Sequence, residues 1–302
     1  MTSRRQFSII ASVSLVSISG SMAQNSVTSP AYFSQREAAI QAQFGKIEAN
    51  ALGRLGVHIF DTATGEEYGY RSDERFMMLS SFKLLASAFV LHRVDIGRES
   101  LDRRMLYTAE DLIPWSPITE KHADGNGMTL ADLCEATITT SDNTAGNLIL
   151  SSFGGPAALT AFARQLGDKV TRLDRIEPEL NVKSTAHFQD TTSPRAMTST
   201  MHKLLIGNAL SIDSRKILRQ WLLRNTTGGK RIKAGLPSDW QVGDKTGTNK
   251  MDSNDVGIVI PPKRAPLLVS VYLAESPAPG TVKDAAIASI GAVVREIVAG
   301  SF

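Results

Sequence analysis

The chain has 302 residues, of which 33 are basic and 30 acidic, so its formal net charge at pH 7 is only +3. This near balance, with no basic stripe interleaved with aromatic residues, argues against a nucleic-acid partner, and the length fits one large domain or two closely joined ones. The single cysteine, Cys134, excludes an intramolecular disulfide, and no Cys/His cluster has zinc-ligand spacing, so we expect neither a metal nor another cofactor.

The first residues have the composition of a secretory signal peptide. Arg4 and Arg5 precede an apolar run over residues 9–18, and small residues follow up to Ala23. The run is too short and too rich in serine for a membrane span of about 20 residues. We therefore expect residues 1–23 to be cleaved after Ala23, which gives an exported protein, periplasmic or secreted, without a membrane anchor. The arginine pair favours the twin-arginine route over a general secretory signal that happens to carry two arginines.

Hydrophobic periodicity predicts a helical middle between strands from both ends of the chain. A helix is expected over 33–50 and a β-hairpin over 55–59 and 68–70. Helical segments should follow over 80–94, 129–140, 156–166, 195–206 (capped by Ser193-Pro194) and 211–224. Strands return at 240–248, 255–260 and 267–275, before a last helix over 283–299. The predicted class is α/β (α+β): a five-stranded antiparallel sheet flanked by helices, built from 24–79 and 225–302, with an all-helical insertion over 80–224 that includes the irregular loop 172–192.

The first chemical motif is Ser80-Ser81-Phe82-Lys83, in which a serine precedes a lysine by three residues. On a helix this spacing puts both side chains on one face, where the lysine could take the proton of the serine hydroxyl. It could do so only if burial and nearby positive charge lowered its pKa. Read alone, the string is a capped helix with a surface lysine, but the strongly apolar segment 80–94 argues against exposure of its first turn.

Two further motifs follow along the chain. Ser141-Asp142-Asn143 lies between two helical segments and, by itself, is typical of a turn or a helix N-cap. Lys245-Thr246-Gly247-Thr248 lies on a predicted strand, which directs Lys245 and Gly247 to one face and the two threonines to the other. Lys245 would supply positive charge there, and Gly247 would allow a ligand to approach the backbone closely.

The fourth motif, Glu177-Pro178-Glu179-Leu180-Asn181, lies in the long loop 172–192. A structureless loop of that size is usually functional or disordered, and the motif favours function. The Glu177 carboxylate could act as a general base on a water molecule, and Asn181 could hold the same water from four residues away.

Together and in this order, the four motifs resemble the active site of the class A serine β-lactamases. The resemblance covers nearly all of the chain after the signal peptide. It implies hydrolysis of the β-lactam amide bond of penicillins and cephalosporins through a serine acyl-enzyme, which confers resistance to these drugs. The site is then expected in the cleft between the sheet and the helical insertion. We expect a monomer whose partner is a small β-lactam.

The resemblance also implies a catalytic role for four side chains. Ser80 would be the nucleophile, and Ser141 would pass a proton to the leaving nitrogen. Glu177 would direct the water that frees the acyl-enzyme. Whether Lys83 or Glu177, through water, first activates Ser80 is left open.

Substrate binding is implied for residues around these four. The backbone N–H groups of Ser80 and Thr248 would form the oxyanion hole, and Asn143 would bind the acylamino carbonyl. Asp142 is expected to brace its loop. The expected substrate-binding residues are Asn143, Asn181, Lys245, Thr246, Gly247, Thr248, Arg231 and Trp115.

For several residues a structural role competes with a functional one. Arg231 would assist recognition of the substrate carboxylate, or be an exposed arginine. Trp115 would line the mouth of the cleft, or pack in the core. The resemblance implies that Arg175 and Asp190 clamp the loop and that the peptide before Pro178 is cis.

Two departures from the family pattern leave the substrate range open. Asn249 stands where relatives often have glycine or cysteine, and one extra residue occurs near 124–127. Two rival functions remain: a penicillin-binding peptidase, which would not need Glu177 and Asn181, and a non-catalytic β-lactam receptor, which usually needs a membrane tether.

Overall fold

The structure is a computed structural model that describes Met1 and residues 30–184 and 188–302. The expected signal segment 1–23, with its cleavage site after Ala23, therefore lies outside the described residues apart from Met1. Among the described residues, none of the helices is long and apolar enough to cross a membrane.

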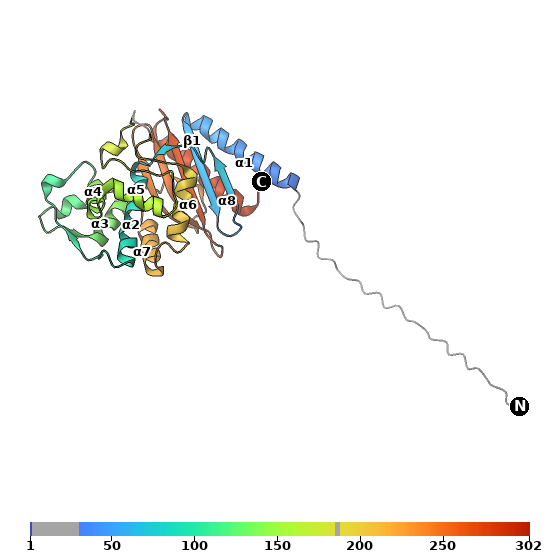
Figure 1. Cartoon of the computed structure of the whole chain (residues 1–302). Helices are drawn as coiled ribbons and strands as arrows, with labels where there is room; N and C mark the ends of the chain where they lie inside the picture. Colours follow the sequence, from blue (N-terminus) through green and yellow to red (C-terminus); the bar gives the residue numbers. More distant parts are fainter. Residues whose placement is uncertain (2–29, 185–187) are drawn as a thin grey trace.

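A five-stranded antiparallel sheet has the strand order β2-β1-β9-β8-β7 (Figure 1). The strands are β1 (Arg54–Asp61), β2 (Glu67–Tyr70), β7 (Gln241–Thr248), β8 (Ser253–Ile260) and β9 (Leu267–Ala274). Strand β1, near the start of the chain, pairs with β9, near its end, with Leu55 opposite Leu273. The predicted sheet, built from both ends of the chain, is confirmed, and β7 forms one of its edges.

The alternation of side chains along β9 divides the apolar core between the two faces of the sheet. Val269 and Val271 pack in one cluster with apolar residues of α1 (Pro30–Ala51) and α8 (Gly280–Ala299). Leu268 and Tyr272 belong to a second cluster, with helices from the middle of the chain. Figure 1 accordingly shows α1 and α8 on one side of the sheet and the green helices on the other.

Four of the six helices of the middle segment begin at a side chain that caps them. They are α2 (Phe82–Asp95), α3 (Leu130–Thr139), α4 (Asn143–Ser152), α5 (Gly155–Gln165), α6 (Pro194–Leu205) and α7 (Ile212–Leu223). Thr129, Asp142, Ser193 and Ser211 each accept a hydrogen bond from the backbone N–H three residues ahead, so each satisfies a donor that the first helical turn leaves free. Two short strand pairs complete the segment: β3 (Phe76–Met77) with β6 (Thr191–Thr192), and β4 (Arg104–Met105) with β5 (Met128–Thr129).

One predicted element differs in a way that matters for the site. The helix expected over 80–94 begins with a 3₁₀ turn, η1 (Leu79–Ser81), so Ser80 lies in this tighter turn and Lys83 on α2. Other 3₁₀ turns are η2 (Ala109–Asp111), η3 (Thr119–His122), η4 (Glu179–Asn181) and η5 (Ile232–Gly235). The division into a sheet domain (24–79 and 225–302) and a helical domain (80–224) stays a proposal.

Candidate active site

Ser80 lies in a turn that the sheet holds in place. The preceding residue, Leu79, is fully buried and has a left-handed φ of +48°, which residues other than glycine rarely adopt. Asn254 on β8 donates its Nδ2 to the backbone oxygen of Met78 at 3.1 Å. Strand β7 approaches so closely that a Cβ at Gly247 would lie 2.9 Å from the Cβ of Leu79. Gly247 therefore allows β7 to pack against the turn that carries Ser80.

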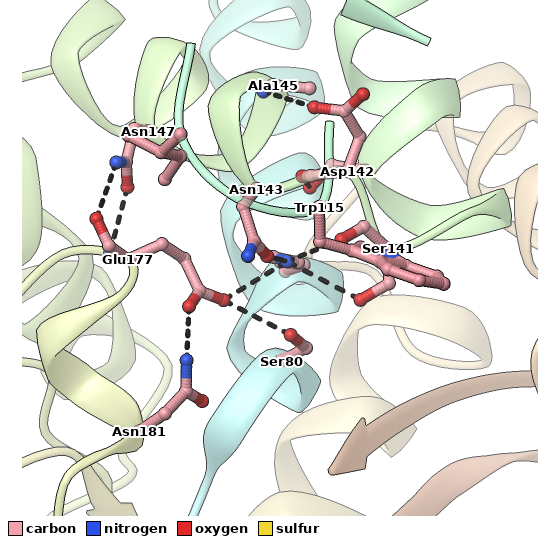
Figure 2. Close-up of polar contacts among 12 residues, drawn as sticks. Ser80, Trp115, Ser141, Asp142, Asn143, Ala145, Asn147, Glu177 and Asn181 are labelled. Atoms are coloured by element: carbon pink, nitrogen blue, oxygen red, sulfur yellow. Dashed lines mark hydrogen bonds and ion pairs between the residues drawn. The ribbon is translucent and has the colours of Figure 1, made fainter. Parts of the chain in front are cut away.

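The carboxylate of Glu177 joins this serine to the long loop (Figure 2). Its Oε1 accepts a hydrogen bond from Ser80 Oγ at 3.1 Å and lies 3.1 Å from Lys83 Nζ. Its Oε2 accepts a hydrogen bond from Asn181 Nδ2. Because the side chains of Lys83 and Glu177 are both fully buried, neither charge has water to stabilise it, and each depends on the other.

Two lysines donate to the hydroxyl oxygen of Ser141. Lys245 Nζ lies 3.0 Å from Ser141 Oγ, and Lys83 Nζ lies 3.4 Å from it. A hydroxyl has two acceptor positions and one donor, so these contacts leave its proton for a third group. Burial lowers the pKa of Lys83, although the charge of Glu177 opposes this shift. Burial lowers the pKa of Lys245 well below its usual value, and the charge of Lys83 lowers it further.

A partly buried ion pair clamps the loop that carries Glu177. Arg175 Nε donates to Asp190 Oδ2 at 2.6 Å, and Asp190 Oδ1 accepts the backbone N–H groups of Asp174 and Arg175 at 2.8 and 2.9 Å. Asp190 is fully buried. The clamp and the cis peptide before Pro178, both implied by the resemblance, are confirmed.

Asn147 on α4 holds the backbone of Glu177 directly. Its Nδ2 donates to the carbonyl oxygen of Glu177 at 2.9 Å, and its Oδ1 accepts the N–H of Glu177 at 3.0 Å (Figure 2). We did not predict this residue from the sequence. The available signal was its spacing, because Asn147 follows Asn143 by four residues, which places both on one face of α4.

Asp142 braces the segment before α4, as predicted. Its Oδ2 accepts the backbone N–H groups of Ile118 and Thr119 at 3.0 and 2.9 Å, and its Oδ1 accepts that of Ala145 at 2.8 Å. These bonds hold the neighbouring Ser141 in a left-handed conformation, with φ of +62°. A strained backbone at a polar site is typical of positions that serve function.

Asn143 and Trp115 lie next to each other beside this segment. Asn143 Oδ1 accepts a hydrogen bond from Lys83 Nζ at 2.6 Å, and its Nδ2 donates to Pro114 O at 2.8 Å. A carboxamide has two N–H donors, so one remains for a ligand. Trp115 is 66% exposed and its backbone oxygen accepts the N–H of Asn143 at 2.9 Å, so the alternative that it packs in the core is wrong.

At the edge strand β7, the threonines contact residues of the segment before η5. Arg231 is only 6% exposed, so the alternative of an exposed arginine is wrong. Its Nη2 donates to Thr248 Oγ1 at 2.7 Å, and its Nε donates to Asp284 on α8 at 2.8 Å. The hydroxyls of Thr227 and Thr246 lie 2.6 Å apart. We did not predict this role of Thr227 from the sequence.

Comparisons with known proteins agree with this geometry. A family model described as "Beta-lactamase enzyme family" matches residues 35–298. A β-lactamase of Streptomyces albus G is 45% identical over 264 residues, which cover 83% of this chain and 82% of that protein. The β-lactamase OXY-2 of Klebsiella oxytoca is 43% identical over 259 residues, covering 85% and 89%.

Solved structures give the same result at closer similarity. An ancestral class A β-lactamase, GNCA, is 55% identical with a TM-score of 0.83, and the match covers 85% of this chain and 99% of that one. The putative class A β-lactamase PenP of Rhodopseudomonas palustris is 52% identical with a TM-score of 0.83, covering 87% and 100%. The chain therefore belongs to the β-lactamase enzyme family. Within it, the protein is a class A serine β-lactamase, which opens the β-lactam amide bond and thereby confers resistance.

Proposed function

We propose that Ser80, Lys83, Ser141 and Glu177 carry out the hydrolysis and that the residues of β7 hold the substrate. One observation carries this proposal: the Glu177 carboxylate bonds Ser80 Oγ with one oxygen and Asn181 with the other. The same base thus reaches both the nucleophile and the residue expected to hold water, which a peptidase or a stalled receptor would not need.

In acylation, Ser80 Oγ attacks the β-lactam carbonyl carbon and the C–N bond of the ring breaks. Glu177 Oε1 lies within hydrogen-bond reach of the Ser80 hydroxyl. This distance favours direct proton transfer from Ser80 to Glu177. Lys83 is paired with this carboxylate as an ammonium, so it can take that proton from Glu177 only after it has given one of its own to Ser141. Ser141 donates its proton to the ring nitrogen, and Lys245 or Lys83, both bonded to its oxygen, replaces that proton.

In deacylation, a water molecule held by both Glu177 and Asn181 attacks the ester carbon. Glu177 takes the proton of the water, and the Ser80 oxygen leaves and recovers a proton. The oxyanion formed in each step would be stabilised by the backbone N–H groups of Ser80 and Thr248. Loss of one such donor costs roughly 3–4 kcal/mol in comparable enzymes.

The carboxylate of penicillins and cephalosporins would bind at the edge of β7. Lys245 supplies the charge, and the hydroxyls of Thr246 and Thr248 supply hydrogen bonds. Arg231 acts on this site through its bond to Thr248 Oγ1. Asn143 would hold the acylamino carbonyl with its second N–H. Trp115 would cover the exposed side of the substrate.

Asn249 closes the far end of this edge and so bears on substrate range. Its Nδ2 donates to the backbone oxygen of Asn181 at 3.1 Å and to Asp252 Oδ2 at 3.0 Å. Its Oδ1 accepts the N–H groups of Met251 and Asp252 at 2.9 and 2.7 Å. These bonds join the end of β7 to the loop that carries Glu177, which limits room for bulky substituents.

We further propose that the protein is exported after cleavage near Ala23 and acts as a monomer. The signal-like composition of residues 1–23 supports export. Size-exclusion chromatography of the exported protein and sequencing of its N-terminus test both points. An intact Met1 on the exported protein would contradict cleavage.

Turnover and intact mass, measured together with a chromogenic cephalosporin, test the mechanism. The parent protein should turn over many substrate molecules per chain. Glu177→Ala should become acylated on Ser80 and release product slowly, since a general base typically contributes a factor of about 10²–10⁴. Ser80→Ala is the control and should show no adduct. If Glu177→Ala hydrolyses penicillins at the parent rate, the assignment of the base is wrong.

A further inference from the structure

Two buried carboxyl groups face each other behind the proposed carboxylate site. Asp244 on β7 and Asp255 on β8 are only 3% and 0% exposed. Asp255 pairs across the strands with Thr246, two residues beyond Asp244, so all three side chains lie on one face of the sheet. The two carboxyl groups are within hydrogen-bond reach of each other.

The surroundings provide donors for one carboxylate charge but not for two. Asp244 Oδ2 accepts a hydrogen bond from Asn225 Nδ2 at 2.8 Å, and Asp255 Oδ2 accepts the backbone N–H of Ile232 at 3.1 Å. Among the described residues, Asp255 Oδ1 has no donor partner although it is buried. Such an oxygen is costly as part of an anion, but a proton placed between the two carboxyl groups satisfies it.

Charge and burial favour the same arrangement. Burial raises the pKa of Asp255 well above its usual value, and the charge of Asp244 raises it further. Burial also raises the pKa of Asp244, but Asn225 and the charge of Lys245 oppose that shift. Of the two carboxyl groups, Asp255 therefore favours the protonated form more strongly.

Hydrogen bonds continue from this pair to the substrate side. Asn225 binds Asp244 with its Nδ2 and accepts the hydroxyl of Thr227 with its Oδ1 at 2.8 Å. Thr227 Oγ1 lies 2.6 Å from Thr246 Oγ1, one of the hydroxyls proposed to bind the carboxylate. The segment that carries Thr227 is packed tightly here, because a Cβ at Gly228 would lie 1.8 Å from Asp244 Oδ2.

We propose that Asp244 and Asp255 share one proton and act as a positioning pair for the substrate carboxylate. The single negative charge of the pair keeps the neighbouring Lys245 in its charged form. The shared proton prevents a second negative charge, which would repel the substrate. This inference rests on the proposed role of Lys245 as the anchor of that carboxylate.

The other charged groups near the pair are already matched. On the segment before η5, Arg231 is paired with Asp284 of α8, and it attracts both aspartates. Lys83 is paired with Glu177. The negative charge of Asp244 raises the pKa of Lys245 against the effect of burial, and that of Glu177 raises it by a smaller amount. Removing the charge of Asp244 should therefore lower the pKa of Lys245.

The test is the pH dependence of kcat/KM for a chromogenic cephalosporin and for its methyl ester, which lacks the carboxylate. In the parent, the preference for the free acid should decline as Lys245 loses its proton at high pH. In the double variant Asp244→Asn/Asp255→Asn this decline should occur at a pH about one unit lower, because a nearby opposite charge shifts a pKa by about that much. The change should appear mainly in KM. In Asp255→Asn, which keeps one negative charge, the decline should stay where the parent has it.

The outcomes distinguish failure of the proposed carboxyl pair from failure of the proposed role of Lys245. A parent that does not distinguish acid from ester would refute the role of Lys245. If the parent distinguishes acid from ester but the folded double variant has the same pH profile as the parent, the proposed role of the carboxyl pair is refuted. Should the double variant not fold, infrared spectra with ¹³C-labelled aspartate decide: at pH 7 the parent should show a protonated carboxyl band that Asp255→Asn lacks. Absence of that band in the parent overturns the inference.

Discussion

Asn147→Ala should reveal how far deacylation depends on the placement of the Glu177 backbone. The variant loses both bonds to the N–H and the carbonyl oxygen of Glu177. Glu177 is 1% exposed, so water cannot readily replace either partner. An unsatisfied buried group costs about 1–3 kcal/mol, so we expect a loss of about 2–4 kcal/mol in the free energy of unfolding.

The kinetic effect should fall on one step more than on the other. A displacement of about 1 Å in a catalytic group can reduce a rate about 10²-fold. Deacylation has Glu177 as its only proposed base, whereas Lys83 can still help to activate Ser80. Deacylation should therefore slow about 10- to 100-fold while acylation slows less, and acyl-enzyme should accumulate. Stopped-flow kinetics and intact mass measure both steps, and urea unfolding gives the stability.

Ser151→Ala on the exposed side of the same helix is the matched control. It should change neither rate, because Ser151 bonds only its own helix, at Leu148 O. The reasoning is refuted if Asn147→Ala loses the expected stability and yet deacylates at the parent rate. In that case Asn147 would stabilise the fold without positioning the base.

Three further predictions concern the clamp, the charge and the edge of the site. Arg175→Ala should lower the free energy of unfolding by about 3 kcal/mol, because it leaves the buried Asp190 unpaired; urea titration that finds no loss contradicts this. Because the pKa of Lys245 lies below its usual value and its charged form binds the substrate, kcat/KM should fall as pH rises through that pKa. Lys245→Arg should keep its charge and extend the plateau to higher pH, and an identical profile would exclude Lys245 as the titrating group. Asn249→Ala should lose its bond to Asn181. The ratio of kcat/KM for a bulky cephalosporin to kcat/KM for benzylpenicillin should then rise. An unchanged ratio would show that this bond does not limit access.

Most of the fold followed from the hydrophobic pattern. The β1–β2 hairpin, the last three strands and the terminal helices all lie within a few residues of their expected bounds. The spacing of apolar residues in these elements reflects which of their faces are buried, and that spacing can be read from the sequence. The 3₁₀ turn at Ser80 could not be predicted this way, because Leu79 adopts its left-handed φ only under the contacts of β7 and β8.

The site was predictable where residues close in sequence act together. Ser80 with Lys83, and Glu177 with Asn181, are such pairs. Asn147 and Thr227 were missed because their partners lie 30 and 19 residues away in the chain. Asp244 and Asp255 were missed for a different reason: a carboxyl group on an expected strand suggests a solvent-facing position, and only the covering segment with Ile232 shows that they are buried.

The pairing of β1 with β9 has a consequence for when the enzyme becomes active. Pairing between these strands joins residues as far apart as Arg54 and Ala274, which are separated by 220 positions. A growing chain therefore cannot complete its sheet until nearly all of it has been synthesised. The turn that carries Ser80 is held by Gly247 and Asn254, which also come late in the chain. The nucleophile and its base are thus assembled last, so an unfinished chain should not hydrolyse an antibiotic.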